Sequence, residues 1–300
     1  MKTILKCSWL IAAVVSLSAC DDIENYGGKG KFYYSNPSTH TITFKLDDKN
    51  YDIFPDSKGV IFLSSGLHHL ENAQGDVTDF FIFENNSGGI INPNQFVYYT
   101  LSEVYAVDGK ETHFKPANYP IVINGHTLDL PIRSSNSIVI DGNLFGCNYP
   151  IGEEFPESIT LNDHKLEGNI KSKCFDKLEL IKYMKDVYGE NLLPQNNYND
   201  SLYSDSINMN FFYDIPRANF DNPSVQQKAE LLVQLVTQLK NSNDANIHKK
   251  LNKSFHQAVI EFVDTYAENA TSNTASENIE YNNFIQRINF LRENGVWIRE

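Results

Sequence analysis

The sequence lacks the short motifs that mark the common catalytic chemistries. It has no Gly-x-Ser-x-Gly elbow, no phosphate-binding glycine loop, no His-Glu-x-x-His pair and no calcium loop with a central glycine. We therefore predict no catalytic residues, no metal ligands and no cofactor. An unrecognised hydrolase is the weaker alternative, since it would need polar groups that converge in a pocket.

Positive charge is also in short supply. Lys and Arg number 25 against 38 Asp and Glu, which leaves a net charge of −13. An acidic surface repels nucleic acid and anionic lipid headgroups, so we predict no nucleic-acid partner. Such a surface fits a basic protein partner, although solubility alone would also account for the charge.

The apolar stretch near the start is too short to cross a bilayer. It runs from Trp9 to Leu17 and follows Lys2 and Lys6. Small residues then lead to Cys20, which completes the layout of a secretory signal. We predict a signal peptide over residues 1–19. Its removal takes away two lysines and no acidic residue, so the charge of −13 becomes −15.

The stretch Leu17-Ser18-Ala19-Cys20 resembles the lipobox of bacterial lipoproteins. This resemblance implies cleavage before Cys20, thioether lipidation of its sulfur, and acylation of the new amino terminus with palmitate-type chains. At ~0.8 kcal/mol per buried CH₂ one chain binds a membrane only marginally, whereas three chains hold the protein there. Asp21 resembles the signal that retains enterobacterial lipoproteins in the inner membrane. The implied location is the inner membrane, facing the periplasm; an ordinary secretory signal with an incidental cysteine is the alternative.

Two cysteines remain for a bridge in the mature protein. Cys7 leaves with the signal and Cys20 carries lipid, so Cys147 and Cys174 are predicted to form a disulfide in an oxidising periplasm. In the chain-entropy estimate, closing a loop of this length stabilises the fold by ~3.5 kcal/mol. Two unpaired thiols or a metal site are the alternatives, and no suitably spaced histidine supports the metal.

Strand patterns begin directly after a short tether. Residues 20–30 are predicted to form the lipidated tether, and residues 31–107 an antiparallel β-sandwich module. Alternation of apolar with polar residues is typical of a half-buried strand. It occurs at Ile42, Phe44 and Leu46.

Other parts of this module are apolar without alternation. The runs Phe80 to Phe83 and Phe96 to Tyr99 predict strands that are covered on both faces. The stretch from Tyr34 to Leu70 is similar to small β-modules of cell-envelope proteins. That similarity implies a binding or spacer role, at the level of fold only.

Residues 108–210 are predicted to be a mixed β/α region that carries the disulfide. Strand patterns continue there, separated by Asn124-Gly125 and Asp141-Gly142, which are strong turn signals. Pro131 is expected to keep its strand at a sheet edge, because proline cannot donate to a ladder.

Helical spacing is predicted to begin at Cys174 and to end at Gly189. Apolar residues recur there every three to four positions. They are Phe175, Leu178, Ile181, Met184 and Tyr188. A polar loop over residues 190–210 follows, because Asn and Ser offer the backbone local partners.

Residues 211–300 are predicted to form a helical bundle, which makes the whole chain α+β. Asn222-Pro223 is typical of a helix start, and Thr274 with Glu277 predicts a capping box. Apolar stripes at helical spacing predict the faces that pack together. The first stripe is Val225, Ala229, Leu232, Leu235, Val236 and Leu239; the second is Ile247, Leu251, Phe255, Ala258, Val259, Phe262 and Tyr266; the third is Tyr281, Phe284, Ile285, Ile288 and Leu291.

Some histidines and aspartates are of the residue types that bind metal ions. They are His68-His69, the pair His248 and His256, and the aspartates Asp200, Asp205 and Asp214. The first pair is interpreted as loop residues at a strand end. The two histidines of the second pair are eight positions apart, which separates their side chains by about 80° around a helix and makes them a poor ligand pair. The aspartates are spaced too loosely for a metal loop and indicate a solvated acidic segment. We assign no site to any of them.

These patterns together predict a membrane-anchored envelope lipoprotein that acts by binding a protein partner. Recruitment is expected through the acidic surface, or through apolar groups at Phe96 to Tyr99 or at an exposed end, Val296 to Ile298. An immunity or inhibitor lipoprotein that neutralises an envelope toxin or enzyme is the alternative.

Overall fold

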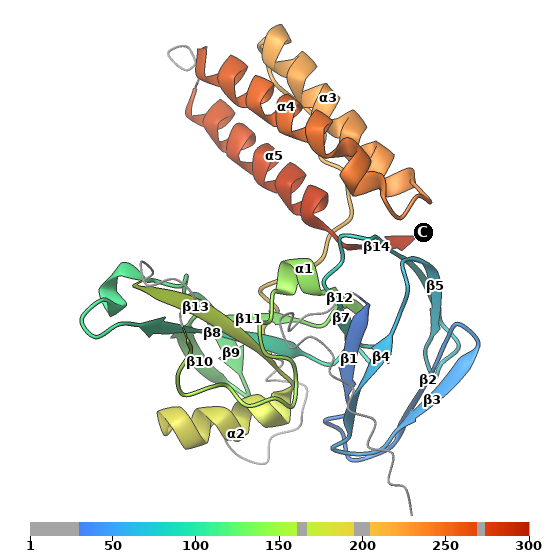
Figure 1. Cartoon of the computed structure of the whole chain (residues 1–300), viewed down its shortest axis with the longest axis vertical. Coiled ribbons are helices and arrows are strands. Elements are labelled where there is room, and N and C mark those ends of the chain that lie inside the picture. The colour runs from blue at the N-terminus through green and yellow to red at the C-terminus, as the bar shows by residue number, and fades with distance from the viewer. Residues whose placement is uncertain (1–29, 161–166, 195–204, 269–273, 300) are drawn as a thin grey trace, which may run out of the picture.

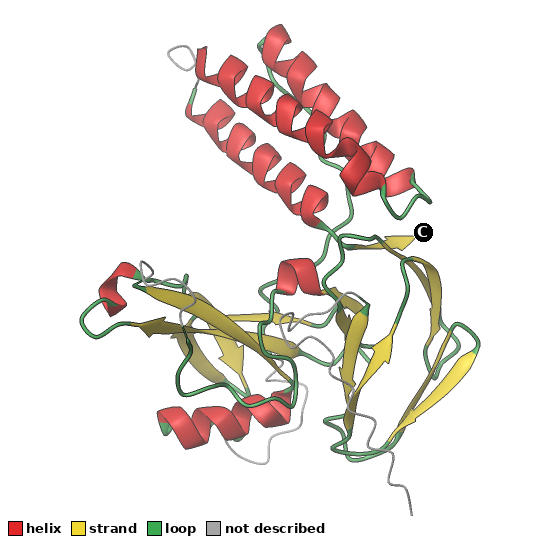
Figure 2. Cartoon of the chain, viewed as in Figure 1, coloured by secondary structure: helices red, strands yellow, loops and turns green. Residues whose placement is uncertain are grey.

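The computed structural model describes residues 30–160, 167–194, 205–268 and 274–299. Sheets occupy the first part of the chain and three long helices the last, so the fold is α+β as predicted (Figures 1 and 2). Residues 205–222 connect the two parts without forming a helix or strand.

Two sheets share one apolar core. The first has the strand order β12 (Val139–Asp141), β7 (Gly89–Ile91), β1 (Lys31–Ser35) and β4 (Lys58–Phe62). The second has the order β14 (Val296–Arg299), β6 (Val77–Ile82), β5 (Gly66–Glu71), β2 (Ile42–Leu46) and β3 (Lys49–Ile53). Both contribute side chains to the shared core, among them Phe32, Ile61 and Ile91 from the first and Phe44, Leu70 and Phe80 from the second.

The alternation predicted for β2 is confirmed. Ile42, Phe44 and Leu46 are buried, and Thr43 between them is exposed. The polar stretch that follows makes a tight hairpin to β3, because Asp47 and Asp48 adopt positive φ angles of 48° and 65°.

The prediction of a wholly antiparallel module was wrong. Strand β1 pairs with β7 in parallel, although the other pairs of these two sheets are antiparallel. In addition, β12 and β14 come from outside residues 31–107 and complete one sheet each. Pairing between strands so distant in sequence leaves no local signal, so the pattern within 31–107 could not reveal it.

Strand β14 also corrects the predicted exposed end of the chain. Val296 and Trp297 are fully buried, and Trp297 lies opposite Phe81 in the antiparallel pairing of β14 with β6. The physical reason is that β6 is apolar on both faces. Phe80 points into the core between the sheets, whereas Phe81 packs with the helices. Strand β14 pairs along the edge of β6 and so covers that edge (Figure 1). The predicted burial of Phe80 to Phe83 is confirmed.

The middle region lies beside these sheets and consists of a three-stranded sheet, a hairpin and a helix. Its elements are β8 (Tyr98–Ala106), β9 (Tyr119–Ile123), β10 (His126–Leu130), β11 (Ile132–Ser135), β13 (Gly168–Phe175) and α2 (Lys177–Tyr188). Strand β8 is the central strand between β11 and β13, and β9 pairs with β10. A 3-10 turn, η1 (Glu111–His113), follows β8, and a short helix, α1 (Gly142–Phe145), follows β12.

Several local predictions in the middle region need adjustment. The run Phe96 to Tyr99 is not all strand, since β8 begins only at Tyr98. Pro131 interrupts the expected strand and separates β10 from β11. Helix α2 starts at Lys177 rather than at Cys174, because Asp176 accepts a hydrogen bond from the Glu179 amide and caps the helix.

The predicted face of α2 is also partly wrong. Leu178 is exposed, and Leu180 takes its place in the core beside Met184. The predicted end is confirmed, since Gly189 caps the helix with φ of 71°.

The C-terminal helices are α3 (Pro223–Asn241), α4 (Ile247–Glu268) and α5 (Ala275–Glu293). Both predicted starts are confirmed: Asn222 caps α3, and Thr274 with Glu277 forms a capping box on α5. The first stripe is entirely buried, and residues of all three helices share one core with Phe81 and Trp297. Within the described residues, no helix combines the length and apolarity needed to cross a membrane.

Candidate functional site

The lipidation and sorting residues lie outside the described part of the chain. Cys20 and Asp21 precede residue 30, and Asp200 falls within 195–204. The predictions made for Cys20 and Asp21 therefore stay predictions.

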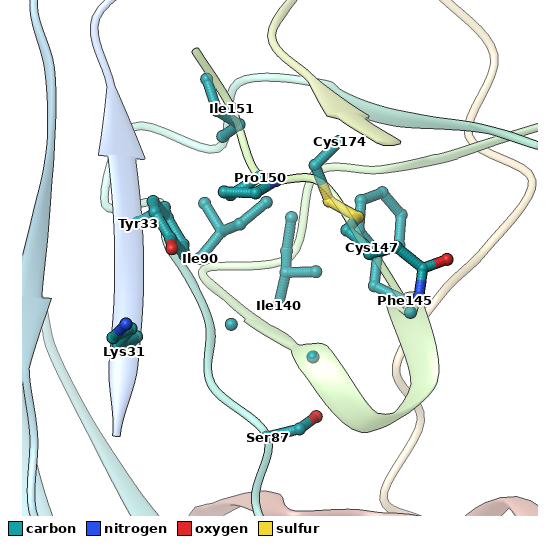
Figure 3. A pocket seen from close by; sticks show the side chains of 14 residues that line it. Lys31, Tyr33, Ser87, Ile90, Ile140, Phe145, Cys147, Pro150, Ile151 and Cys174 are labelled. Carbon is teal, nitrogen blue, oxygen red and sulfur yellow. A yellow bond between two sulfur atoms is a disulfide. The ribbon is translucent and has the colours of Figure 1, made fainter. Parts of the chain in front are cut away.

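The structure places Cys147 and Cys174 at disulfide distance, with Cα atoms 5.5 Å apart (Figure 3). Cys174 is in β13, and the segment after Cys147 runs along the same strand. The amides of Asn148 and Tyr149 donate to the Ser172 carbonyl, and Tyr149 forms a parallel bridge with Lys173. The disulfide thus connects β13 to a segment that is already hydrogen-bonded to it.

The histidine pair lies inside β5, so its interpretation as loop residues was wrong. His68 Nδ1 is 2.6 Å from Asp47 Oδ2, and its Nε2 is 2.8 Å from the Ser64 carbonyl oxygen. His69 Nδ1 is 2.6 Å from Asp79 Oδ1. In the described ranges, no group of three His, Cys, Asp or Glu side chains could hold a metal ion.

Asp205 is buried, which corrects its interpretation as part of a solvated acidic segment. Its carboxylate accepts hydrogen bonds from the Tyr99 hydroxyl and the Asn124 amide, and lies 2.9 Å from Lys177 Nζ. Its side chain is only 3% exposed. Asp205 therefore anchors the connecting segment to the middle region.

Polar and aromatic side chains converge in a groove of the middle region. The groove has a volume of about 590 Å³ and lies between β8, β13, α2 and the segment 152–157. Its lining includes Glu103, Tyr105, Glu153, Glu154, Phe155, Glu157, Lys173, Glu179, Tyr183 and Asp186. We call it the acidic groove.

Phe155 is the centre of the aromatic part of the acidic groove. Its ring centroid lies 6.0 Å from that of Tyr105, 5.7 Å from that of Tyr149 and 6.0 Å from that of Tyr183. Pairs at these distances stabilise one another beyond their buried area. The rings come from β8, the 147–157 segment and α2, so the cluster ties three parts of the middle region together.

Glu103 fixes two of the tyrosines. Tyr183 and Tyr188 each donate a hydroxyl hydrogen bond to Glu103 Oε1, at 2.9 and 2.8 Å. Burial, followed by the hydrogen bond and the charge of Glu103, raises the pKa of both phenols. Both tyrosines therefore stay neutral donors, and the negative charge of Glu103 remains in the groove.

A buried ion pair lies beneath this surface. Lys173 is 2% exposed, and its ammonium donates to Glu179 at 2.7 Å and to the carbonyls of Cys174 and Pro150 at 2.9 and 3.2 Å. Burial lowers the pKa of Lys173, and Glu179 opposes that shift. Glu179 also accepts from the Gly152 amide, so the pair holds the 150–152 turn against α2.

This arrangement is suited to holding a cation. Aromatic faces attract ammonium and guanidinium groups, and carboxylates bind the same groups by charge-assisted hydrogen bonds. The basic side chains in the lining are already engaged: Lys173 bonds Glu179, and Lys182 bonds Asp186 at 3.0 Å. Glu103, Glu153, Glu154 and Glu157 then remain as the excess of negative charge.

Sequence reasoning missed these residues because they are dispersed along the chain. Glu103 and Tyr105 belong to β8, Tyr183 belongs to α2, and the disulfide region supplies the rest. The available local signal was the stretch 153–157, in which three glutamates flank Phe155 and Pro156.

Comparison with known proteins identified no relative of this chain. No family model matches the chain, and no curated protein or solved structure matches it either. Any function has to be argued from the geometry of the chain itself.

Proposed function

We propose that this protein is a lipid-anchored protein of the bacterial envelope that binds a cationic segment of a partner protein in the acidic groove. The observation that carries the proposal is the convergence of Glu103, Glu153 and Glu154 with the rings of Phe155 and Tyr183 in one open groove. Catalysis is not part of the proposal.

Long-range charge would bring such a partner to the groove. The chain carries a net charge of −13, and an acidic field raises the rate at which a basic surface arrives. Aromatic rings held by Glu103 then provide rigid faces for a lysine or arginine side chain. Rigid aromatic contacts favour binding, since little side-chain freedom is lost.

The remaining parts of the molecule would serve as anchor and scaffold. Lipidation at Cys20 would hold the chain at a membrane, and Asp21 would favour the inner membrane, facing the periplasm. We further propose that the two sheets with a shared core form a β-sandwich and that α3 to α5 form a helical bundle. Both would position the middle region without contributing to the groove.

An immunity or inhibitor role is a narrower version of the same proposal. An acidic groove is a suitable surface for neutralising a basic enzyme or toxin, because charge complementarity accelerates capture. The identity of the partner separates this role from general recruitment.

Site-specific crosslinking in intact cells tests the proposal. A photoreactive residue replaces Val187, which lines the acidic groove and is 58% exposed, and in a control it replaces Lys253 on the exposed face of α4. We expect a basic protein to be captured from position 187 and not from position 253. Capture should weaken when Glu153→Gln and Glu154→Gln are combined. Equal capture from both positions, or capture that these two substitutions do not weaken, would contradict the groove as the binding site.

The anchor needs its own test. Because lipidation requires the thiol at position 20, Cys20→Ala should abolish incorporation of a fatty-acid label and leave an unprocessed or lipid-free form. Equal labelling of the wild type and the variant would remove the basis for the anchor and leave the groove proposal untouched.

A further inference from the structure

A second cavity lies apart from the acidic groove, where the first sheet meets the disulfide. It has a volume of about 320 Å³ and lies between β1, β7, α1 and the Cys147–Cys174 pair (Figure 3). Ligand cavities in proteins range from about 300 to 1,000 Å³, so this one is suited to a small molecule. We call it the β1 pocket.

The interior of the β1 pocket is apolar. Ile90 and Ile140 form its floor, Phe145 and the disulfide form one side, and Ile151 closes another (Figure 3). These side chains are buried in the fold, and all of them reach the cavity. A ligand that fits must therefore present apolar surface to most of the pocket.

Polar groups lie on the side formed by β1. Lys31 and Tyr33 are two positions apart on this strand, so both face the cavity (Figure 3). Burial, with a smaller effect of Glu153, raises the pKa of Tyr33, which keeps its hydroxyl as a donor. The other polar lining groups are engaged: Ser87 donates to Asn143, and the Asn148 side chain accepts from the Ser172 amide.

Lys31 is the charged group of the pocket. Burial raises the pKa of Glu153, and the charges of Lys173 and Lys31 oppose that rise. Within the described part of the chain, no carboxylate lies within 4.0 Å of the Lys31 ammonium. An ammonium beside an apolar cavity, in a chain of net charge −13, favours a ligand with one negative charge. An apolar molecule without charge would leave this ammonium without a new partner.

We propose that the β1 pocket binds a small amphipathic monocarboxylate, such as a short acyl chain. The carboxylate accepts hydrogen bonds from the Lys31 ammonium and the Tyr33 hydroxyl. The hydrocarbon part lies on Ile90, Ile140 and Phe145. The β1 pocket and the acidic groove share no lining residue and select opposite charges, although the charge of Glu153 in the groove acts on Lys31 and Tyr33.

The probes for this site are hexanoate and 1-hexanol, which share an alkyl chain and differ in charge. The full chain is labelled at its isoleucine methyl groups, and each probe is titrated while methyl spectra are recorded. We expect hexanoate to shift Ile90, Ile140 and Ile151 and to show nuclear Overhauser contacts with them. Hexanoate should bind at least about ten-fold more tightly than hexanol, the ratio that corresponds to 1.4 kcal/mol.

Two substitutions and a control make the test specific. Lys31→Met should remove the preference for hexanoate, whereas Lys31→Arg should retain it because the charge stays. Lys253→Met on α4 removes the same charge elsewhere and should change nothing. Unchanged spectra of distant methyl groups would establish that each variant is folded.

Three outcomes would overturn the proposal. They are the absence of shifts at the pocket isoleucines at saturating hexanoate, equal affinities for hexanoate and hexanol, and an unchanged preference in Lys31→Met. None of these results bears on the acidic groove, since that groove shares no isoleucine with the pocket.

Discussion

The C-terminal helices and the middle region are held together by different kinds of interaction. Helices α3 to α5 share an apolar core, and their ion pair Lys228–Glu261 lies at the surface with each side chain 34% exposed. The middle region also has an apolar core, which includes Leu101, Ile121 and Leu180, but in addition it buries charge, with Lys173 at 2% and Asp205 at 3% exposure.

Buried charges are a costly way to stabilise a fold. The free-energy cost of removing two ions from water often cancels their mutual attraction, so apolar packing would stabilise the fold equally well. In the middle region the buried groups each hold a particular segment: Lys173 holds the 150–152 turn, and Asp205 holds the connecting segment. We infer that the Lys173–Glu179 pair, which lines the acidic groove, fixes the surface of that groove, whereas the helices are built for packing.

The largest expected effect is on the free energy of unfolding, and it distinguishes the buried ion pair of the middle region from the surface ion pair of the helices. Glu179→Gln leaves the Lys173 ammonium buried without its carboxylate, and we expect a loss of about 3–5 kcal/mol in the free energy of unfolding. The matched change Glu261→Gln breaks the surface pair of α4 and should cost less than about 1 kcal/mol. Urea unfolding followed by circular dichroism measures both. Similar losses in the two variants would refute the contrast.

Loss of the disulfide is expected to come next. The chain-entropy estimate for the loop between Cys147 and Cys174 gives ~3.5 kcal/mol, which reduction or paired Ala substitution should remove. The purified protein should show no free thiol at these positions until it is reduced and unfolded. Rapid alkylation of the native, unreduced protein would show that the cysteines are unpaired.

One titratable group gives the helices a pH dependence of their own. His248 packs against Phe83, and burial, with the nearby charge of Arg292, lowers its pKa to about 4 from the usual 6.5. Between these values the unfolded chain binds more protons at this residue, so the contribution of His248 to stability should fall by up to about 3 kcal/mol as pH drops from 6.5 towards 4. Buried Asp141 acts in the opposite direction, because burial raises its pKa to about 6.

His248→Phe tests this dependence because it keeps an aromatic ring against Phe83 and removes the titration. Relative to the wild type, its unfolding free energy should rise as pH drops from 6.5 towards 4, because the destabilising protonation of the unfolded His248 is absent. His256→Gln on the exposed face of α4 is the control and should retain the wild-type profile. An identical pH profile in His248→Phe would disprove the assignment.

The smallest expected effect is at the start of α3. Asn222 accepts hydrogen bonds from the amides of Ser224 and Val225, so Asn222→Ala should cost about 1 kcal/mol. Ser224→Ala, an exposed neighbour within the same turn, should have little effect. Equal losses in these two variants, measured by thermal unfolding, would mean that the cap contributes nothing.

The C-terminal helices and the strand that follows them differ in how far their sequence predicts their structure. The stripe from Val225 to Leu239 and the capping box at Thr274 were predicted correctly, because helical packing and caps depend on residues a few positions apart. Strand β14 was missed, since its pairing with β6 joins residues more than 200 positions apart. The apolar residues Val296 to Ile298 were predicted to be an exposed end that contacts another protein, because nothing local in the sequence identifies β6 as their partner.

The acidic groove could be predicted only in part. The chain's negative charge predicted a basic partner but gave no location for its binding surface. The contribution of Glu103 and Tyr183 could not be predicted, because it depends on how α2 lies across β8. Asp205 was misjudged for the same reason: a polar loop predicts solvent exposure, whereas tertiary contacts with Tyr99 and Lys177 bury this carboxylate.

The most direct test of the account is the salt dependence of partner association at the acidic groove. With the captured partner, association rates are measured from 0.01 M to 0.15 M salt, over which the Debye length falls from about 30 Å to about 8 Å. The groove variant combines Glu153→Gln, Glu154→Gln and Glu157→Gln. A control with the same change in net charge combines Glu230→Gln, Asp264→Asn and Glu268→Gln on the helices.

We predict that association of the wild type slows steeply with salt, that the groove variant associates more slowly with a flatter dependence, and that the control resembles the wild type. A flat profile for the wild type, or equal effects of the two triple variants, would contradict recruitment through the acidic groove.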